Sequence, residues 1–224
     1  GVGVPIDAGL DNRLRHFINR AETFALPNKK AAYELTHIVF YLSEYGRRDP
    51  ELSAQAVQSL MYTGILAHLE ENADLLSEVC VALRYAGQIP PAAWEQWIAT
   101  VLRGFDRKDH RSDGSNDHYH EYLVVNWAGA QMGMPVFQGP YGREGQAFYS
   151  PVAPLGAMRA LSETLFQQRS ERRATWGAME KSVTAVLPEA ICAHLADVIA
   201  ASDQFESFFE HFARAETPAM KSVP

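Results

Sequence analysis

The sequence predicts an all-α fold, and three observations lead to this expectation. Capping residues and prolines recur along the chain, the apolar residues between them repeat with the helical period, and no stretch alternates apolar and polar residues between turn residues. The 224 residues, 47% of them hydrophobic, are enough to bury one sizeable core. We therefore expect residues 1–224 to form a single helical domain.

Capping residues, prolines and glycines predict where the helices begin and end. Asp49 and Pro50 predict the start of a helix that runs through Leu69, and Asn72 predicts the N-cap of the next, which stops at Gly87. Prolines also open the helices that begin at about residues 90 and 188, the second of them long and amphipathic. The other helices are expected at about 10–22, 29–45, 116–131 and 156–184.

Two segments interrupt the helical pattern. Residues 106–117 form a polar loop of the kind that stays solvated. Residues 133–156 contain five glycines and four prolines together with large aromatic residues, so they cannot be helical, yet they are too apolar for a disordered linker. We expect this segment to pack over the core, either as a lid over a site or as an ordered connection.

Charge and hydropathy exclude several classes of protein. The formal charge is −7 and no basic run exceeds two residues, which argues against nucleic acid and against an anionic membrane as partners. No apolar stretch approaches the roughly 20 residues of a membrane span, and residues 1–9 do not resemble a signal peptide. Cys80 and Cys192 are far apart in apolar surroundings, as expected of two buried thiols. We expect a soluble, cytoplasmic protein.

Two of the expected helices lack the charged face that a surface helix turns toward water. In residues 33–45 an apolar stripe lies opposite a face that is mainly aromatic, with one imidazole and one carboxylate: Tyr33, His37, Phe40, Tyr41 and Glu44. The helix that starts near Asn116 places Tyr119, Leu123, Trp127 and Ala130 on one packing face. Its opposite face holds His118, Tyr122, Val125 and Gly129, with Glu121 and Asn126 at the edges. We expect both helices to be buried on two sides and to line a partly polar interior.

Such a cluster favours acid–base chemistry on a small molecule, because buried imidazoles, carboxylates and phenols can have pKa values near the working pH. The candidate catalytic residues are His37, Tyr41, His118, Glu121 and Tyr122, and the candidate substrate-binding residues are Tyr33, Glu44, Asn126, Tyr141 and Phe148. Elimination, isomerisation or cyclisation without a cofactor would suit these groups. Each residue also has a structural explanation: His37 as a hydrogen-bonded core histidine, and Glu44 as the ion-pair partner of Arg47 or Arg48.

A transition metal such as zinc or iron is the second interpretation of the same residues. Glu34 and His37 are three positions apart, as are His118 and Glu121, so two helices could each present a pair of ligands. Further carboxylates would have to come from Glu70, Glu78, Glu163, Glu206 or Glu210. A mononuclear or dinuclear oxidase or hydrolase would follow from this arrangement.

A non-catalytic ligand-binding or scaffold protein is the third interpretation. Phosphate loops, Gly-x-Ser-x-Gly, Cys-x-x-Cys and His-Glu-x-x-His are absent from the sequence, so no motif selects a reaction. Phe205, Phe208, Phe209 and Phe212 share one face of the last helix, which is typical of a core stripe and also compatible with a homodimer contact.

Two segments, "AYELTHIVFYLSEYGRRDP" and "DHYHEYLVVNWA", resemble recurring motifs of an uncharacterised family of helical bacterial proteins that are often found near natural-product pathways. The resemblance implies helix hairpins around a central pocket, as in an α/α toroid or a bundle, and a role in specialised metabolism. The residues it carries over are His37, Tyr41, Asp117, His118, Tyr119 and His120. It implies no particular activity.

Overall fold

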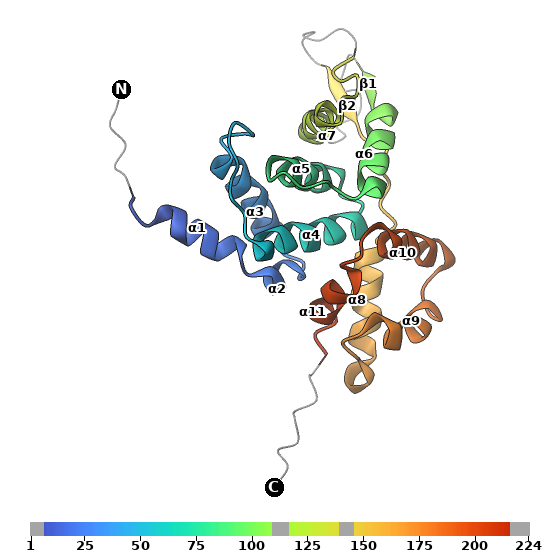
Figure 1. The fold of residues 1–224 in the computed structure, drawn as a ribbon. Helices are drawn as coiled ribbons and strands as arrows, with labels where there is room; N and C mark the ends of the chain where they lie inside the picture. Colours follow the sequence, from blue (N-terminus) through green and yellow to red (C-terminus); the bar gives the residue numbers. More distant parts are fainter. Residues whose placement is uncertain (1–6, 109–116, 139–145, 216–224) are drawn as a thin grey trace.

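The computed structural model describes residues 7–108, 117–138 and 146–215, and these residues are mostly helical (Figure 1). The helices in the described part are α1 Leu10–Ile18, α2 Ala21–Phe24, α3 Lys29–Leu42, α4 Ala54–Leu69, α5 Ala73–Tyr85, α6 Ala92–Gly104, α7 Tyr119–Gln131, α8 Ala157–Gln167, α9 Trp176–Thr184, α10 Glu189–Ala201 and α11 Phe205–Phe212, with a 3₁₀ turn at Arg169–Glu171. The predicted helical class is confirmed.

A small antiparallel ribbon is the one departure from this class in the described part of the chain. Strand β1, Asp106–Lys108, pairs with β2, Ala147–Tyr149, and Arg107 lies opposite Phe148. Both strands fall in segments for which we expected loops. Three residues are too few for alternation of side chains to be recognised in a sequence, which explains why the ribbon was not predicted.

Helix starts agree with the sequence where a capping side chain is present. Asn72 caps α5 as predicted, and its Oδ1 accepts a hydrogen bond from Leu75 N at 3.0 Å. Helix α4, in contrast, begins at Ala54 and not at Pro50. Glu51 has a φ of +52°, which a right-handed helix cannot include, so Ser53 provides the N-cap instead.

Two predicted long helices are each divided. Arg169 has a φ of +46°, and it separates α8 from α9. Ser202 has an extended backbone, with φ −146° and ψ 131°, which ends α10 before α11 begins. The four phenylalanines of α11 are all buried, so the predicted core stripe is confirmed.

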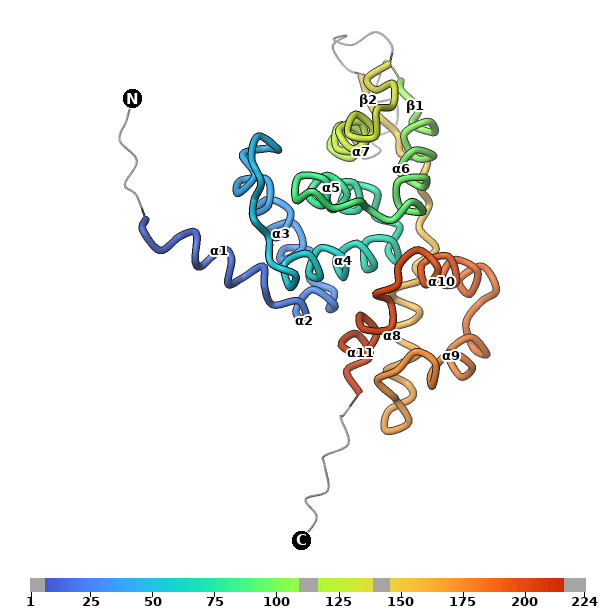
Figure 2. The backbone as a smooth tube through the Cα atoms, viewed as in Figure 1, coloured from blue at the N-terminus to red at the C-terminus, as the bar shows by residue number. Residues whose placement is uncertain are grey.

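Helix α5 occupies the middle of the molecule, in contact with α3, α4, α6 and α7 (Figure 2). Residues 75–83 are all buried, and Glu78 is the acidic residue among them. Beneath α5, Gly64 of α4 lies against the fully buried indole of Trp94, where a Cβ would come within 2.2 Å of the ring. The core therefore depends on close contact between α4 and α6 as well as on the apolar faces of α5.

Helices α8–α11 gather at one end of the molecule, where α8, α10 and α11 pack on α4. His194 of α10 and His68 of α4 meet at this contact, with ring centroids 5.4 Å apart, and His194 Nε2 lies 3.0 Å from the His68 carbonyl oxygen. Cys80 is buried as expected, whereas Cys192 is partly exposed, and both are free thiols. No helix in the described residues has the length and apolar character that crossing a bilayer requires.

The faces of α3 and α7 differ from the expectation that neither meets water. Helix α3 exposes one line of side chains: Lys30, Glu34, His37 and Tyr41. Helix α7 exposes Tyr119 and Leu123, which we expected to pack in the core, whereas Tyr122 on the opposite face is buried as expected. The reason is that β2 covers this side of α7, with the Phe148 ring stacked on Tyr122 at a centroid distance of 4.3 Å.

Candidate functional site

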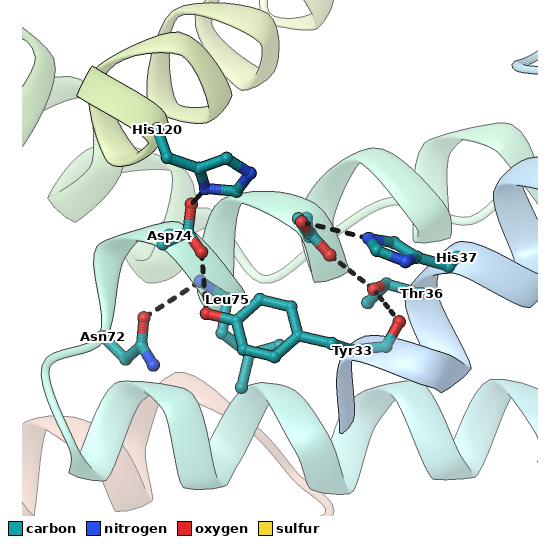
Figure 3. A network of polar contacts seen from close by, with 8 residues as sticks. Tyr33, Thr36, His37, Asn72, Asp74, Leu75 and His120 are labelled. Carbon is teal, nitrogen blue, oxygen red and sulfur yellow. Dashed lines mark hydrogen bonds and ion pairs between the residues drawn. The ribbon is translucent and has the colours of Figure 1, made fainter. Parts of the chain in front are cut away.

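A network of polar side chains links α3, α5 and α7, and it is centred on Asp74 of α5 (Figure 3). The Tyr33 hydroxyl donates a hydrogen bond to Asp74 Oδ2 at 2.7 Å. On the other side of the carboxylate, His120 Nδ1 lies 2.9 Å from Oδ1. Burial raises the pKa of Tyr33 well above its usual range, and the bond to Asp74 adds to the effect, so this phenol stays protonated as the donor.

One turn along α5, Glu78 forms a second contact with α3. Its side chain is 3% exposed, accepts a hydrogen bond from Thr36 Oγ1 at 2.5 Å, and has Oε1 3.6 Å from His37 Nε2. Burial raises the pKa of Glu78, while the Thr36 hydroxyl and the nearby His37 act against this increase. Asp74 and Glu78 therefore form two carboxylate–histidine pairs on one face of α5.

The two imidazoles of these pairs remain open to solvent. The side chain of His120 is 61% exposed and that of His37 is 55% exposed, although their carboxylate partners are mostly buried. Because a carboxylate oxygen can only accept, the contact with Asp74 Oδ1 places a proton on Nδ1 of His120 and directs Nε2 away from the carboxylate. Nε2 is therefore the nitrogen of His120 that faces a ligand.

A cavity of about 440 Å³ lies beside the network, where α5 and α7 begin. Its lining residues are Lys29, Glu70, Glu71, Asn72, Ala73, His118, Glu121, Ser150, Val152, Pro154, Gly156, Met158 and Arg159. Asn72 and Ala73 directly precede Asp74 in the chain, and Glu121 follows His120. The cavity and the network are therefore neighbouring parts of one region.

Ser150 organises the two titratable residues of the cavity. Its backbone N donates to His118 Nδ1 at 3.1 Å, and its hydroxyl donates to Glu121 Oε1 at 2.5 Å. Because Nδ1 of His118 is an acceptor, the neutral ring carries its proton on Nε2 and acts as a donor. Burial raises the pKa of Glu121 and the charge of Asp74 adds to this, whereas Ser150 and His118 lower it.

A family model described as a domain of unknown function, DUF6902, matches residues 2–215. The chain belongs to this family. No curated protein and no solved structure matches it. The family is consistent with the resemblance to uncharacterised proteins noted in the sequence.

The DUF6902 structure brings together four of the residues predicted from sequence. Tyr33 and His37 belong to the polar network, and His118 and Glu121 line the adjacent cavity. Residues of α3 and α7 therefore lie in one region, with α5 between the two helices supplying the carboxylates. Nδ1 of His118 accepts the hydrogen bond of Ser150 N, so this nitrogen is already engaged within the protein.

Three other predicted residues lie outside the site on the surface of α3 and its C-terminal end. Tyr41 is 64% exposed, and its ring meets that of Tyr45 edge to face at a centroid distance of 6.0 Å. Glu44 lies 3.6 Å from Arg48, which agrees with the ion-pair interpretation of this residue. Glu34 points along the same exposed line, 3.9 Å from Lys30.

The remaining predicted residues lie in a different cavity or beyond the described structure. Tyr122 and Asn126 line a second cavity, away from His118 and Glu121, and Phe148 packs on Tyr122. Asn126 has a structural role, because its amide donates to Tyr122 O and accepts from Phe137 N, both at 2.7 Å. Tyr141 lies outside the described residues.

The predicted metal ligands are not brought together. Glu34 faces Lys30 and His37 faces Glu78, whereas His118 and Glu121 both bind Ser150. Within residues 7–108, 117–138 and 146–215, no three His, Cys, Asp or Glu side chains are grouped in a way that could hold a metal ion. The zinc or iron site predicted from Glu34, His37, His118 and Glu121 therefore has no support in the described structure.

Sequence reasoning missed Asp74 and Ser150 and assigned Glu78 only to a group of supporting carboxylates. An aspartate in the first turn of a helix is favoured by the helix dipole, so Asp74 gave no signal by itself. The available signal was its spacing: Asp74 and Glu78 are four residues apart in a helix whose other interior positions are nearly all apolar. Two carboxylates on one face of a buried helix require partners from neighbouring helices.

Proposed function

We propose that the protein is a small-molecule enzyme of lyase, isomerase or cyclase type that uses acid–base chemistry. The observation that carries this proposal is the position of Asp74, which is hydrogen-bonded to Tyr33 and His120 beside a cavity that contains Glu121. A buried carboxylate that orients an exposed imidazole, next to a second carboxyl group with a raised pKa, provides a base and an acid in one region.

The groups divide the proton transfers between them. Nε2 of His120 takes a proton from a carbon or oxygen atom of the substrate, and Asp74 stabilises the imidazolium that forms. Glu121, which holds its proton at a higher pH than an ordinary glutamate, donates a proton to another atom of the same substrate. Nε2–H of His118 donates a hydrogen bond that orients a substrate oxygen. The net result is an isomerisation, or an elimination when a leaving group departs.

The wider sequence expectations fit this proposal. The resemblance led us to expect helix hairpins around a pocket. The cavity at the beginning of α5 and α7 could serve as this pocket, since it is large enough for a small metabolite. The connection from β2 to α8 supplies Ser150 and Val152 to the cavity wall, and this position supports a role as a lid for part of residues 133–156. The resemblance to proteins near natural-product pathways suggests a substrate from specialised metabolism.

An untargeted turnover assay tests the proposal. The 224-residue chain is incubated in deuterated water with bacterial metabolite extracts, and products are followed by mass spectrometry. An isomerase gives deuterium incorporation at constant composition, and a lyase gives two fragments whose masses sum to the substrate. We expect His120→Gln and Glu121→Gln to abolish the change and His16→Gln, at an exposed position on α1, to retain it.

Two outcomes would count against the enzyme. If a metabolite co-purifies with the protein or stabilises it but is never altered, the protein is a ligand-binding module. If the wild type and His120→Gln convert a metabolite at equal rates, the carboxylate–histidine pair is not the catalytic group.

A further inference from the structure

The Glu78–His37 pair has the same construction as the Asp74–His120 pair, yet the proton transfers proposed above give a role only to the second pair. In each pair the carboxylate of α5 is mostly buried, with side-chain exposures of 3% for Glu78 and 15% for Asp74. Each carboxylate faces an imidazole whose side chain is more than half exposed. Burying a carboxylate costs free energy, so a second buried carboxylate behind an open imidazole indicates a second group that acts on a ligand.

The two pairs lie side by side along α5. Asp74 and Glu78 are four residues apart, which places them about 6 Å apart along one face of the helix. Their imidazoles come from different helices, His37 from α3 and His120 from α7, as Figure 3 shows. Burial raises the pKa of Glu78, and the charges that act on it include those of both His37 and His120. Both imidazoles therefore lie within electrostatic reach of one carboxylate, close enough to contact a single small molecule.

Each ring turns one nitrogen away from its carboxylate. Asp74 Oδ1 lies 2.9 Å from Nδ1 of His120, so Nε2 of this ring points away. Glu78 Oε1 lies 3.6 Å from Nε2 of His37, so here Nδ1 points away. The His37 ring also lies against the buried ring of Phe40, at a centroid distance of 6.0 Å, which limits the directions that His37 can take. One nitrogen from α3 and one from α7 are thus presented to a molecule bound over this face of α5.

We propose that His37 is a second catalytic residue and that the enzyme inverts a stereocentre carrying hydrogen beside a carbonyl group, with His120 and His37 acting from opposite sides. A single base returns a proton to the face from which it took the proton, so inversion requires a second group on the other face. This reaction rests on the proposed acid–base function and narrows it to an epimerase or racemase. Its substrates are carbonyl compounds whose C–H bond is acidic enough for an imidazole.

Protons and electrons balance in this reaction. Neutral His120 takes the proton from carbon, the C–H electron pair forms a carbon–carbon double bond, and the carbonyl electron pair moves to the oxygen, which Glu121 protonates. Glu121 then takes back the oxygen proton, the carbonyl forms again, and protonated His37 donates its proton to the opposite face of the carbon. His120 ends protonated and His37 neutral, and exchange with solvent through the exposed rings restores both. Imidazole suits both steps because it takes either form near neutral pH.

Chiral separation combined with deuterium incorporation tests the proposal. The 224-residue chain is incubated with a bacterial metabolite extract in deuterated water, and each compound is separated into stereoisomers before mass spectrometry. We expect one metabolite to be converted to its stereoisomer, with one deuterium at the inverted carbon. His37→Gln should lower the rate of inversion by about 10²–10⁴-fold. Given either pure stereoisomer of this metabolite, the His37→Gln variant should exchange only the hydrogen that faces His120.

Glu34→Gln is the matched control, because Glu34 lies on the same exposed line of α3 but faces Lys30, at 3.9 Å. This variant should invert the metabolite at the wild-type rate. Glu78→Gln tests the carboxylate, and it should change the ¹⁵N NMR shifts of the His37 ring as well as the rate of inversion. His37 is at an exposed position, so His37→Gln tests the proposal even if Glu78→Gln does not fold.

The outcomes separate this reaction from the broader acid–base function. If a metabolite is cleaved or rearranged without inversion, the acid–base function stands and the inversion is overturned. The inversion is also overturned if His37→Gln inverts at the wild-type rate, if this variant exchanges the hydrogen of both stereoisomers, or if Glu34→Gln slows inversion as much. If no metabolite changes at all, the acid–base function fails together with the inversion.

Discussion

His120 Nδ1 and Asp74 Oδ1 lie 2.9 Å apart, and this contact joins an exposed imidazole on α7 to the mostly buried helix α5. The second oxygen of Asp74 accepts the hydroxyl proton of Tyr33 from α3. One carboxylate therefore connects three helices, and it fixes which nitrogen of His120 carries the proton.

Replacement of Asp74 tests this connection. Asparagine has one acceptor oxygen in place of two, so Asp74→Asn must leave either Tyr33 or His120 without its acceptor. We expect the free energy of unfolding to fall by about 1–3 kcal/mol, and ¹⁵N NMR shifts of His120 to report a mixture of tautomers. Asp11→Asn is the control, because Asp11 forms an exposed pair with Arg15. Unchanged His120 shifts in Asp74→Asn would show that Asp74 does not select the tautomer.

The raised pKa of Glu121 predicts how stability depends on pH. The folded protein keeps the proton of this carboxyl group at pH values where the unfolded chain, with a pKa of about 4.5, has released it. The free energy of unfolding should therefore fall as the pH rises from about 4.5 through the raised pKa. Glu121→Gln should reduce this slope in urea denaturation between acidic and neutral pH.

Ser150→Ala provides the matched variant for Glu121. It removes the hydroxyl that donates to Oε1 and lowers the pKa, so the pKa of Glu121 should rise further. Carboxyl ¹³C NMR titration measures the change. A lower pKa in Ser150→Ala would contradict the assigned contact.

His68 predicts a pH dependence of the opposite sign. Burial and the neighbouring His194 lower the pKa of His68 from 6.5 to about 4, while Asp197 acts against them. The unfolded chain binds a proton in this range before the folded protein does, so the free energy of unfolding should fall as the pH drops from about 6.5 to about 4. The loss is on the order of 3 kcal/mol, and His68→Gln should remove most of it. An unchanged slope in His68→Gln, or an equal reduction in His16→Gln, would assign the effect to other groups.

Gly64 gives a prediction about packing. A methyl group here would lie 2.2 Å from the Trp94 ring, which is fully buried and cannot move aside without displacing α6. Gly64→Ala should lower the free energy of unfolding by about 1–3 kcal/mol or more. Gly177→Ala is the control, because nothing lies within 4 Å of its added Cβ and alanine favours the helix. Thermal denaturation of both variants measures the difference. A Gly64→Ala variant as stable as Gly177→Ala would contradict the prediction.

The sequence predicted those features that depend on residues close to one another in the chain. The cap at Asn72 and the buried stripe of α11 are examples, since capping and periodicity are local properties. It did not predict which side of α7 is buried, because that is decided by β2, which lies about 25 residues further along the chain.

The site shows the same division between local and distant causes. Tyr33, His37, His118 and Glu121 were identified from their types and spacing. Their partners Asp74 and Ser150 were not identified. Nothing in the local sequence shows that the fold brings Asp74 to the phenol of Tyr33, or Ser150 to the carboxyl group of Glu121. The Tyr122 side chain leaves α7 in another direction than those of His118 and Glu121, and it therefore lines a different cavity.

The enclosure of α5 by four other helices has a consequence for how the site can change. Amide protons of a helix covered on all sides exchange with solvent only when the cooperative unit that contains the helix opens. Glu78, in the buried middle of α5, thus cannot be withdrawn by fraying of its own helix, and its geometry lasts as long as the native state does. Adjustment to a ligand has to come from the periphery, where residues 150–156 rest on the cavity through a few hydrogen bonds such as that from Ser150 to Glu121.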